Sequence, residues 1–183
     1  MKIATIGRGN IGGGLARLWR KAGHDVTELG RDGGDVSDVD VLLVAVPGQQ
    51  ISGAFDKVTG FQGKPTIDAT NAVRGRDEGY ESLAHQVKSI VGGPTAKSFN
   101  LNFAVLFDEI EKQRVRPSNW FASDDEVREV TEQLIRDAGY EPLYVGGLEH
   151  ARALEDHLGL LFAASQAGLG GQCFYRYAIP GEL

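Results

Sequence analysis

The first 31 residues of the chain follow the order strand, glycine turn, helix, strand and arginine. A short apolar run, residues 2–6, enters a turn that contains three glycines, and a second short strand, residues 25–29, ends at Gly30 and Arg31. The segment between them has the apolar spacing of a helix that buries one face, and Gly23 is placed to end it in a left-handed cap. Its buried stripe is expected to consist of Ile11, Leu15, Leu18 and Ala22. This order predicts two parallel strands joined by a crossover helix.

The turn itself reads Gly7, Arg8, Gly9, Asn10, Ile11 and Gly12. Each glycine has its own role in a dinucleotide site: Gly7 permits the tight turn, Gly9 lets the backbone approach a pyrophosphate, and Gly12 lets the helix pack against the strand. The first turn of the helix then offers unpaired amides and a partial positive charge to that pyrophosphate. We therefore expect these six residues to bind a dinucleotide. The alternative is a glycine-rich turn without a ligand.

The end of the second strand indicates which dinucleotide the chain would bind. An NAD site places an acidic residue about 20 residues after the glycine motif, where it holds the ribose hydroxyls. Here Gly30 occupies that place and Arg31 follows, which suits the extra 2′-phosphate of NADP because a guanidinium can bind it through two hydrogen bonds. Arg8 adds positive charge on the same side. Glu28 lies on the same strand face and could instead hold a ribose diol, but the pattern favours NADP(H).

Length and charge limit the remaining possibilities. A chain of 183 residues suits one domain, with a sheet and its covering helices in residues 1–146 and a helical C-terminal extension in residues 147–183. The net charge of −6 argues against a nucleic-acid partner, and no apolar run reaches the roughly 20 residues that span a membrane. Cys173, the only cysteine, is expected to fill space in a C-terminal helix. Its isolation and the absence of a signal peptide predict a cytoplasmic protein.

Strands and helices continue to alternate, which predicts a doubly wound α/β fold of Rossmann type with a mainly parallel sheet. Residues 39–46 are almost continuously aliphatic, as expected of a strand covered on both faces. Only nine residues separate Arg31 from Val41, too few for the usual helix and strand, so we expect a trimmed sheet edge and an open adenine side, with residues 33–35 as a remnant. The other expected strands are residues 65–70, 96–99, 120–122 and 140–145. The other expected helices include residues 49–58, 80–91 and 102–111. A further helix is expected to begin at a capping box that starts at Ser123 and to end at Gly139, and two helical pieces are expected from residue 148 onward, with a break near residues 168–171.

Polar residues follow the carboxyl ends of two of these strands, where open parallel sheets bind ligands. Asn71 and Asn100 could orient a carboxamide or a hydroxyl through paired donor and acceptor groups, or they could simply form turns. Asp68 is expected to cap a turn, and Lys97 is expected to be a solvated lysine at a strand end. Of the four, Asn71 and Asn100 are the stronger candidates for ligand binding.

The C-terminal half contains no recognisable metal or nucleophile motif. His150 and His157 are two helical turns apart, which differs from the adjacent-turn spacing of helical metal sites. Glu155 and Asp156 beside them are expected to form a solvated helix face. No serine elbow or cysteine–histidine pair indicates a covalent intermediate, so we predict no metal site and identify no catalytic residue.

Six segments carry a resemblance to known proteins: residues 7–12, 30–31, 43–47, 67–71, 97–100 and 146–152. Over nearly its whole length the chain resembles the family of NADP-dependent oxidoreductases that act on the 8-hydroxy-5-deazaflavin coenzyme, factor 420. It is also similar to the N-terminal domain of the six-transmembrane epithelial antigen of the prostate metalloreductases. The resemblance implies that Arg31 reads the 2′-phosphate and that Val46, Pro47, Asn71 and Ala72 line the groove towards the nicotinamide. Gly30 stands where such proteins often carry a serine.

These observations predict an NADP(H)-dependent oxidoreductase that transfers hydride between nicotinamide and a planar acceptor such as a deazaflavin or flavin. Direct transfer between two heterocycles needs no general acid, which agrees with the missing acid–base motif. Asn100 is a tentative substrate contact, and the apolar stretch 158–179 could roof the nicotinamide or form a homodimer face. Two alternatives stay open: a reductase of small carbonyls or imines, and a non-catalytic NADP(H)-binding sensor module.

Overall fold

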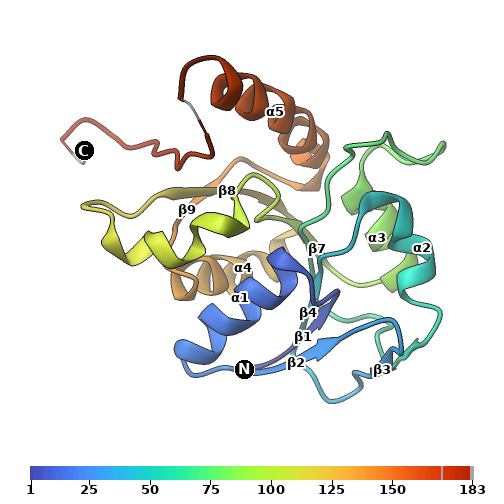
Figure 1. The fold of residues 1–183 in the computed structure, drawn as a ribbon. Helices are drawn as coiled ribbons and strands as arrows, with labels where there is room; N and C mark the ends of the chain where they lie inside the picture. The colour runs from blue at the N-terminus through green and yellow to red at the C-terminus, as the bar shows by residue number, and fades with distance from the viewer. Residues whose placement is uncertain (170, 182–183) are drawn as a thin grey trace.

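The computed structural model describes residues 1–169 and 171–181, which form a seven-stranded sheet between helices (Figure 1). The strand order is β2-β1-β4-β6-β7-β8-β9, and the first five strands are parallel. Strand β8 runs antiparallel to β7, and β9 pairs parallel with β8. The doubly wound, mainly parallel fold is therefore confirmed. The strands are β1 (Lys2–Ile6), β2 (Asp25–Leu29), β4 (Val41–Val44), β6 (Thr66–Asp68), β7 (Thr95–Lys97), β8 (Ser118–Ser123) and β9 (Glu141–Tyr144).

The helices agree with the expected order, but several are shorter than the sequence suggests. Helix α1 begins right after Gly9 and is followed by Gly23 at φ +93°, the left-handed position expected of it. The helix expected over residues 49–58 is only a 3₁₀ turn and one α turn, and the segment expected over residues 102–111 is 3₁₀ rather than α. The α-helices are α1 (Asn10–Lys21), α2 (Ile51–Ala54), α3 (Leu83–Val91), α4 (Asp125–Asp137) and α5 (Ala151–Ala164); the 3₁₀ segments are η1 (Gly48–Gln50), η2 (Ala104–Lys112) and η3 (Leu148–His150); a π turn, η4, covers Ser165–Leu169.

Alternation along the central strands produces two cores, one on each face of the sheet. Leu43 of β4 packs with Leu15 and Trp19 of α1 and with the inner side of α4. Its neighbour Val44 points the other way and packs with α2 and α3. Figure 1 shows α1 and α4 together on one face and α2 and α3 on the other. Burial on both faces explains why residues 41–44 are entirely apolar.

The edge of the sheet beside β2 is trimmed, as expected from the short spacing after Arg31. Strand β2 ends the sheet, because no further strand of the described residues pairs with it. The remnant exists as β3 (Gly34–Asp35), but it pairs with β5 (Val58–Thr59) in a separate two-stranded sheet. The chain that follows Arg31 is thus attached to the segment after α2.

Two predictions about helix ends are wrong. Ser123 does not cap α4. Asp124 occupies the N-cap position, but its carboxylate accepts hydrogen bonds from Lys88 and from the amide of Thr95 rather than from the amides of the helix. The second C-terminal helical piece does not form, so Cys173 lies in an irregular segment, residues 171–181. This segment runs beside β8, where the amide of Ser118 donates to a main-chain carbonyl of the segment. Position 170 of the expected helix break and residues 182–183 of the expected extension lie outside the described residues.

Candidate functional site

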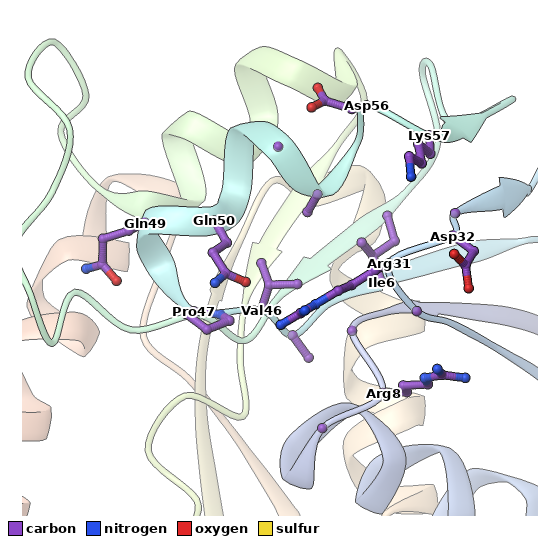
Figure 2. A pocket seen from close by; sticks show the side chains of 17 residues that line it. Ile6, Arg8, Arg31, Asp32, Val46, Pro47, Gln49, Gln50, Asp56 and Lys57 are labelled. Carbon is purple, nitrogen blue, oxygen red and sulfur yellow. The ribbon is translucent and has the colours of Figure 1, made fainter.

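A cavity of about 1090 Å³, called the first cavity below, opens at the carboxyl ends of β1, β2 and β4 (Figure 2). This is the edge at which parallel α/β sheets bind ligands. Seven of the predicted cofactor residues line it: Gly7, Arg8, Gly9, Gly30, Arg31, Val46 and Pro47. The opposite wall of the cavity comes from η1, α2 and the turn after α2, and its residues were not predicted from the sequence. They include Gln49, Gln50, Gly53, Ala54, Asp56 and Lys57.

The glycines of the first turn are required by close backbone contacts. Gly7 has φ +106°, and a Cβ atom there would lie 2.4 Å from the carbonyl oxygen of Ala45. A Cβ atom on Gly12 would lie 1.8 Å from the carbonyl oxygen of Gly7, so the helix and the turn are in direct backbone contact. Gly9 differs, because no atom of the described chain lies within 4 Å of its Cβ position. The turn is therefore compact on the protein side and open above Gly9, where a pyrophosphate could approach.

Arg8 and Gly30 are in contact at the end of β2. A Cβ atom on Gly30 would lie 2.8 Å from Nε and 2.9 Å from Cζ of Arg8, so the guanidinium rests on the bare glycine backbone. A serine at position 30 would occupy the space that the Arg8 side chain now fills. The contact with Arg8 is thus a local reason for a glycine, rather than a serine, at position 30.

The carboxylate that could have held a ribose diol has another partner. Glu28 Oε1 accepts a hydrogen bond of 2.6 Å from Arg20 of α1, and Glu28 is not among the described residues that line the first cavity. Arg8 and Arg31 do line it, and neither forms an ion pair with any described residue. The charged groups available at this end of the cavity are therefore mainly cations, which favours a phosphate over a ribose diol.

A second cavity of about 510 Å³ also lies at the start of α1, where Gly9 lines the first cavity and the next residue, Asn10, lines the second. Predicted residues Asn10, Ile11, Asn71 and Asn100 lie here rather than in the first cavity. Gly12 and Ala72 line neither cavity: Gly12 packs against the carbonyl of Gly7, and Ala72 packs into the core near α2 and α3. The walls come from α1, from the loops after β6 and β7, and from α5. The lining residues are Asn10, Ile11, Gly14, Arg17, Asn71, Val73, Asn100, Leu101, Asn102, Phe103, Ala104, Val105, Leu158 and Phe162.

The second cavity is apolar at its mouth. Val73 is 72% exposed, and the rings of Phe103 and Phe162 meet edge to face at 6.0 Å. Arg17 is the only titratable side chain among the described lining residues, and it is held by Asp108 at 2.5 Å. Of the apolar stretch 158–179, this cavity uses Leu158 and Phe162.

Asn71 and Asn100 are joined by two hydrogen bonds at the back of the second cavity. The amide of Asn71 donates to the Asn100 carbonyl at 2.7 Å, and the amide of Asn100 donates to the side-chain oxygen of Asn71 at 3.1 Å. Asn100 also donates to the carbonyl of Leu154 in α5. Each side chain therefore links two loops and also lines the cavity, and its part in orienting a ligand stays a prediction.

Lys97 is not solvated, so this prediction is wrong. Its side chain is fully buried, and its ammonium group donates to Asp68 at 2.7 Å and to the Thr70 carbonyl at 2.6 Å. It also lies 3.1 Å from Glu155, which is buried as well, so the expected solvated face at Glu155 is also wrong. The prediction for Asp68 is confirmed, because its other oxygen accepts from the amide of Thr70. Burial raises the pKa of the Asp68 carboxyl, while the Lys97 ammonium acts in the opposite direction.

Glu155 connects this buried charge cluster to the loop that follows β6. Its carboxylate accepts from the amide of Leu83 at 2.9 Å and from Arg76 at 2.7 Å, and Arg76 also binds Asp156 at 2.6 Å. Each of the three buried charges of this cluster, Asp68, Lys97 and Glu155, is paired, as the cost of burying an isolated ion requires. One sequence signal could have indicated the cluster: Asp68 and Lys97 end adjacent parallel strands and are direct partners in the register.

Phe99 has an unusual backbone next to Asn100. It is the one non-glycine among the described residues with a left-handed φ, at 60°, a conformation that costs energy unless its surroundings enforce it. Its buried ring meets Trp19 edge to face at 5.8 Å, and its amide and the Ser98 hydroxyl both donate to the side-chain oxygen of Asn119. These contacts hold the turn that points Asn100 towards Asn71.

The histidines of the C-terminal half are separated in space. His157 stacks on Trp120 with ring centroids 5.9 Å apart, and His150 is exposed near the start of α5. No group of three or more potential ligands within residues 1–169 and 171–181 could hold a metal ion. Likewise, no helix in this part of the chain is long and apolar enough to cross a membrane.

The chain is similar to known proteins in its structure and not in its sequence. No protein-family model and no curated protein matches the sequence. A solved structure from Arthrobacter sp. FB24, provisionally described as a factor 420-dependent NADP reductase, has a TM-score of 0.82 at 20% identity and covers 98% of this chain and 100% of its own. An imine reductase from Myxococcus stipitatus in complex with NADP⁺ has a TM-score of 0.65 at 17% identity, covering 92% of this chain and 63% of its own. The 3-hydroxyisobutyrate dehydrogenase of Mycobacterium tuberculosis has a TM-score of 0.58 at 14% identity, covering 94% of this chain and 72% of its own.

The chain shares its fold with these three solved structures. At these identities the likeness is one of architecture, and residues must be assigned from the geometry of the chain itself.

Proposed function

We propose that the protein is an NADP(H)-dependent oxidoreductase that exchanges hydride with a planar acceptor, a deazaflavin or a flavin. The observation that carries this proposal is the presence of two cavities on either side of the start of α1. The first cavity has an open glycine turn and two arginines without an ion-pair partner among the described residues, and the second is largely apolar, with Arg17 as the one titratable group among its described lining residues. A dinucleotide in the first cavity would present its nicotinamide end towards the second.

The residues present fit NADP(H) in three places. The open space above Gly9 and the amides at the start of α1 suit the pyrophosphate. Arg8 and Arg31 suit the 2′-phosphate. Val46 and Pro47 also line the first cavity, on the side opposite Arg8, and Figure 2 shows the Arg31 side chain extending towards them. When bound, the nicotinamide would supply the hydride, and the chain would supply position and dryness.

The chemistry of the second cavity favours a planar heterocycle over a small carbonyl or imine. Reduction of a carbonyl needs a proton donor close to the reacting carbon. The described lining residues offer no such group, since Arg17 is held by Asp108 and the polar residues are asparagines. A deazaflavin or flavin ring accepts hydride without a protein acid, and the exposed apolar walls suit a flat ring.

Oxidation of NADPH by the purified full chain, followed by the absorbance of the reduced nicotinamide, tests the proposal. Four reactions are compared: with a deazaflavin, with flavin mononucleotide, with a panel of small carbonyl compounds and imines, and without acceptor. Turnover with the deazaflavin or the flavin supports the proposal. Turnover with carbonyls or imines alone would replace it with the small-molecule reductase, and tight NADPH binding without turnover on any acceptor would replace it with a sensor module.

A further inference from the structure

Three cations line the first cavity: Arg8, Arg31 and Lys57 (Figure 2). None of them forms an ion pair with any described residue. The cations of helix α1 differ in this respect, because Arg17, Arg20 and Lys21 each form an ion pair with a carboxylate. In a chain with a net charge of −6, a group of unpartnered cations in a cavity indicates an anionic ligand.

Lys57 is held beside the segment that carries Arg31 by main-chain contacts. The amide of Gly34 donates to the Lys57 carbonyl at 3.0 Å. A Cβ atom on Gly33 would lie 1.9 Å from the same carbonyl oxygen, so the two backbones touch. The next residue, Val58, then pairs with Gly34 in the small β3–β5 sheet. The turn after α2 therefore forms the wall that the missing helix–strand unit leaves open.

The charge balance of the first cavity depends on Lys57. Two carboxylates, Asp32 and Asp56, line the cavity together with the three cations. Figure 2 shows the carboxylate of Asp56 directed away from the cavity and that of Asp32 beside Lys57. Asp32 follows Arg31 directly and would repel a phosphate bound there. Lys57 offsets that charge, and without it the lining would contain two cations and two carboxylates.

We propose that Lys57 is a specificity-determining residue that binds the 2′-phosphate of NADP(H) together with Arg8 and Arg31. This inference rests on the proposed function, since it assigns one more residue to the same nucleotide site. On this inference, the turn after α2 supplies a positive charge at the edge of the sheet beside β2, where the usual helix and strand are missing.

Binding of two pairs of nucleotides to the full chain tests the inference. Adenosine 2′,5′-bisphosphate is compared with adenosine 5′-monophosphate, and NADPH with NADH, because each pair differs only in the 2′-phosphate. Three variants are titrated calorimetrically beside the wild type: Lys57→Met, Lys57→Arg and Lys21→Met. Lys21→Met is the matched control, because it removes the same charge from an exposed lysine at the far end of α1.

Lys57→Met is expected to weaken the binding of adenosine 2′,5′-bisphosphate and NADPH about three- to fivefold, the upper part of the range for an exposed charged contact, and to leave the affinity for the partner nucleotides unchanged. Added salt should reduce the difference, and Lys57→Arg should retain most of the affinity. If Lys57→Met retains the wild-type preference for the 2′-phosphate, or weakens both members of each pair equally, the inference is overturned while the proposed function stands. If the wild type binds none of the four nucleotides, the proposed function itself fails.

Discussion

The ammonium nitrogen of Lys97 lies 2.7 Å from the carboxylate of Asp68, and neither side chain reaches solvent. The pair joins the carboxyl ends of β6 and β7, and the contact of Lys97 with Glu155 adds α5. Asn71 and Asn100 follow these two strands by three residues each and line the second cavity. The buried charges therefore lie directly behind the place where we put the acceptor and fix the three elements that form it.

Replacing Lys97 by methionine tests how strongly these elements depend on the buried cation. The substitution leaves the buried carboxylate of Asp68 without its cationic partner and leaves Glu155 with Arg76 alone, so we expect the free energy of unfolding to fall by about 3–5 kcal/mol. Urea denaturation measures the change. Lys88→Met is the matched control, because its ion pair with Asp124 has the same 2.7 Å distance but a lysine that is 44% exposed, and its loss should cost about 1 kcal/mol or less. Equal losses in the two variants would contradict a special role for burial.

The features that the sequence predicts correctly are local ones. The glycine turn and the left-handed Gly23 both depend on residues within one strand–helix–strand unit. The same holds for the trimmed edge, since the short spacing after Arg31 excludes a further helix and strand whatever the rest of the chain does. The predicted stripe of α1 is only partly right: Leu15 is buried and Ile11 and Leu18 are half-buried, but Ala22 is exposed, and the rest of the buried face consists of Gly12, Ala16 and Trp19. Alternation of apolar residues on two faces then fixes the order of layers.

The features that it does not predict depend on pairing between distant segments. Glu155 looks like part of a solvated helix face, because its partners Lys97 and Arg76 are far away in sequence and become neighbours only when α5 packs. Lys57 reaches the first cavity only because β5 pairs with β3. The second C-terminal helix fails for a similar reason, since its apolar residues instead pack beside β8 as an irregular segment.

Removal of the Arg31 guanidinium should weaken NADPH selectively. Arg31 lines the first cavity and forms no ion pair within the described part of the chain, so its charge is available to the 2′-phosphate. For Arg31→Ala we expect a loss of about 1.5–3 kcal/mol in NADPH binding, the value of a hydrogen bond to a charged group, and little change for NADH. Calorimetric titration with both nucleotides measures this difference. Equal losses for NADH and NADPH would show that Arg31 does not read the phosphate.

A methyl group on Gly30 should act on the nucleotide site through Arg8. Its Cβ atom would come within 2.8 Å of the Arg8 side chain, which is flexible and can move away. Gly30→Ala is therefore expected to leave the free energy of unfolding within about 0.5 kcal/mol of the wild type, as surface substitutions usually do, while NADPH binding weakens several-fold. Gly12→Ala provides the contrast, because there the methyl would lie 1.8 Å from a main-chain oxygen and should cost about 1–3 kcal/mol of stability. Unchanged NADPH affinity in Gly30→Ala would mean that Arg8 does not contribute.

Two buried tyrosine hydroxyls should make the fold sensitive to alkali. Burial raises the pKa of both Tyr140 and Tyr175 well above the usual phenol value. In the unfolded chain these groups release protons near pH 10, whereas in the folded chain they stay protonated, so stability is retained below about pH 10 and falls as the pH rises further. Urea midpoints measured at about pH 9 and about pH 11 should differ, and Tyr175→Phe should reduce the difference. A midpoint in Tyr175→Phe that falls with pH as steeply as in the wild type would contradict this cause.

Truncation of Phe162 should affect the acceptor and leave the nucleotide alone. Phe162 lies one turn after Leu158 on α5, and both line the apolar second cavity, where a flat ring would contact them. An aromatic contact contributes about 0.5–1.5 kcal/mol, so Phe162→Ala should raise the KM for the planar acceptor roughly three- to tenfold, with NADPH affinity unchanged. Leu160→Ala is the control on the same helix, since Leu160 is 63% exposed and is not among the described residues lining the cavity. A rise in the acceptor KM of equal size in both variants, or a parallel loss of NADPH affinity in Phe162→Ala, would place the acceptor elsewhere.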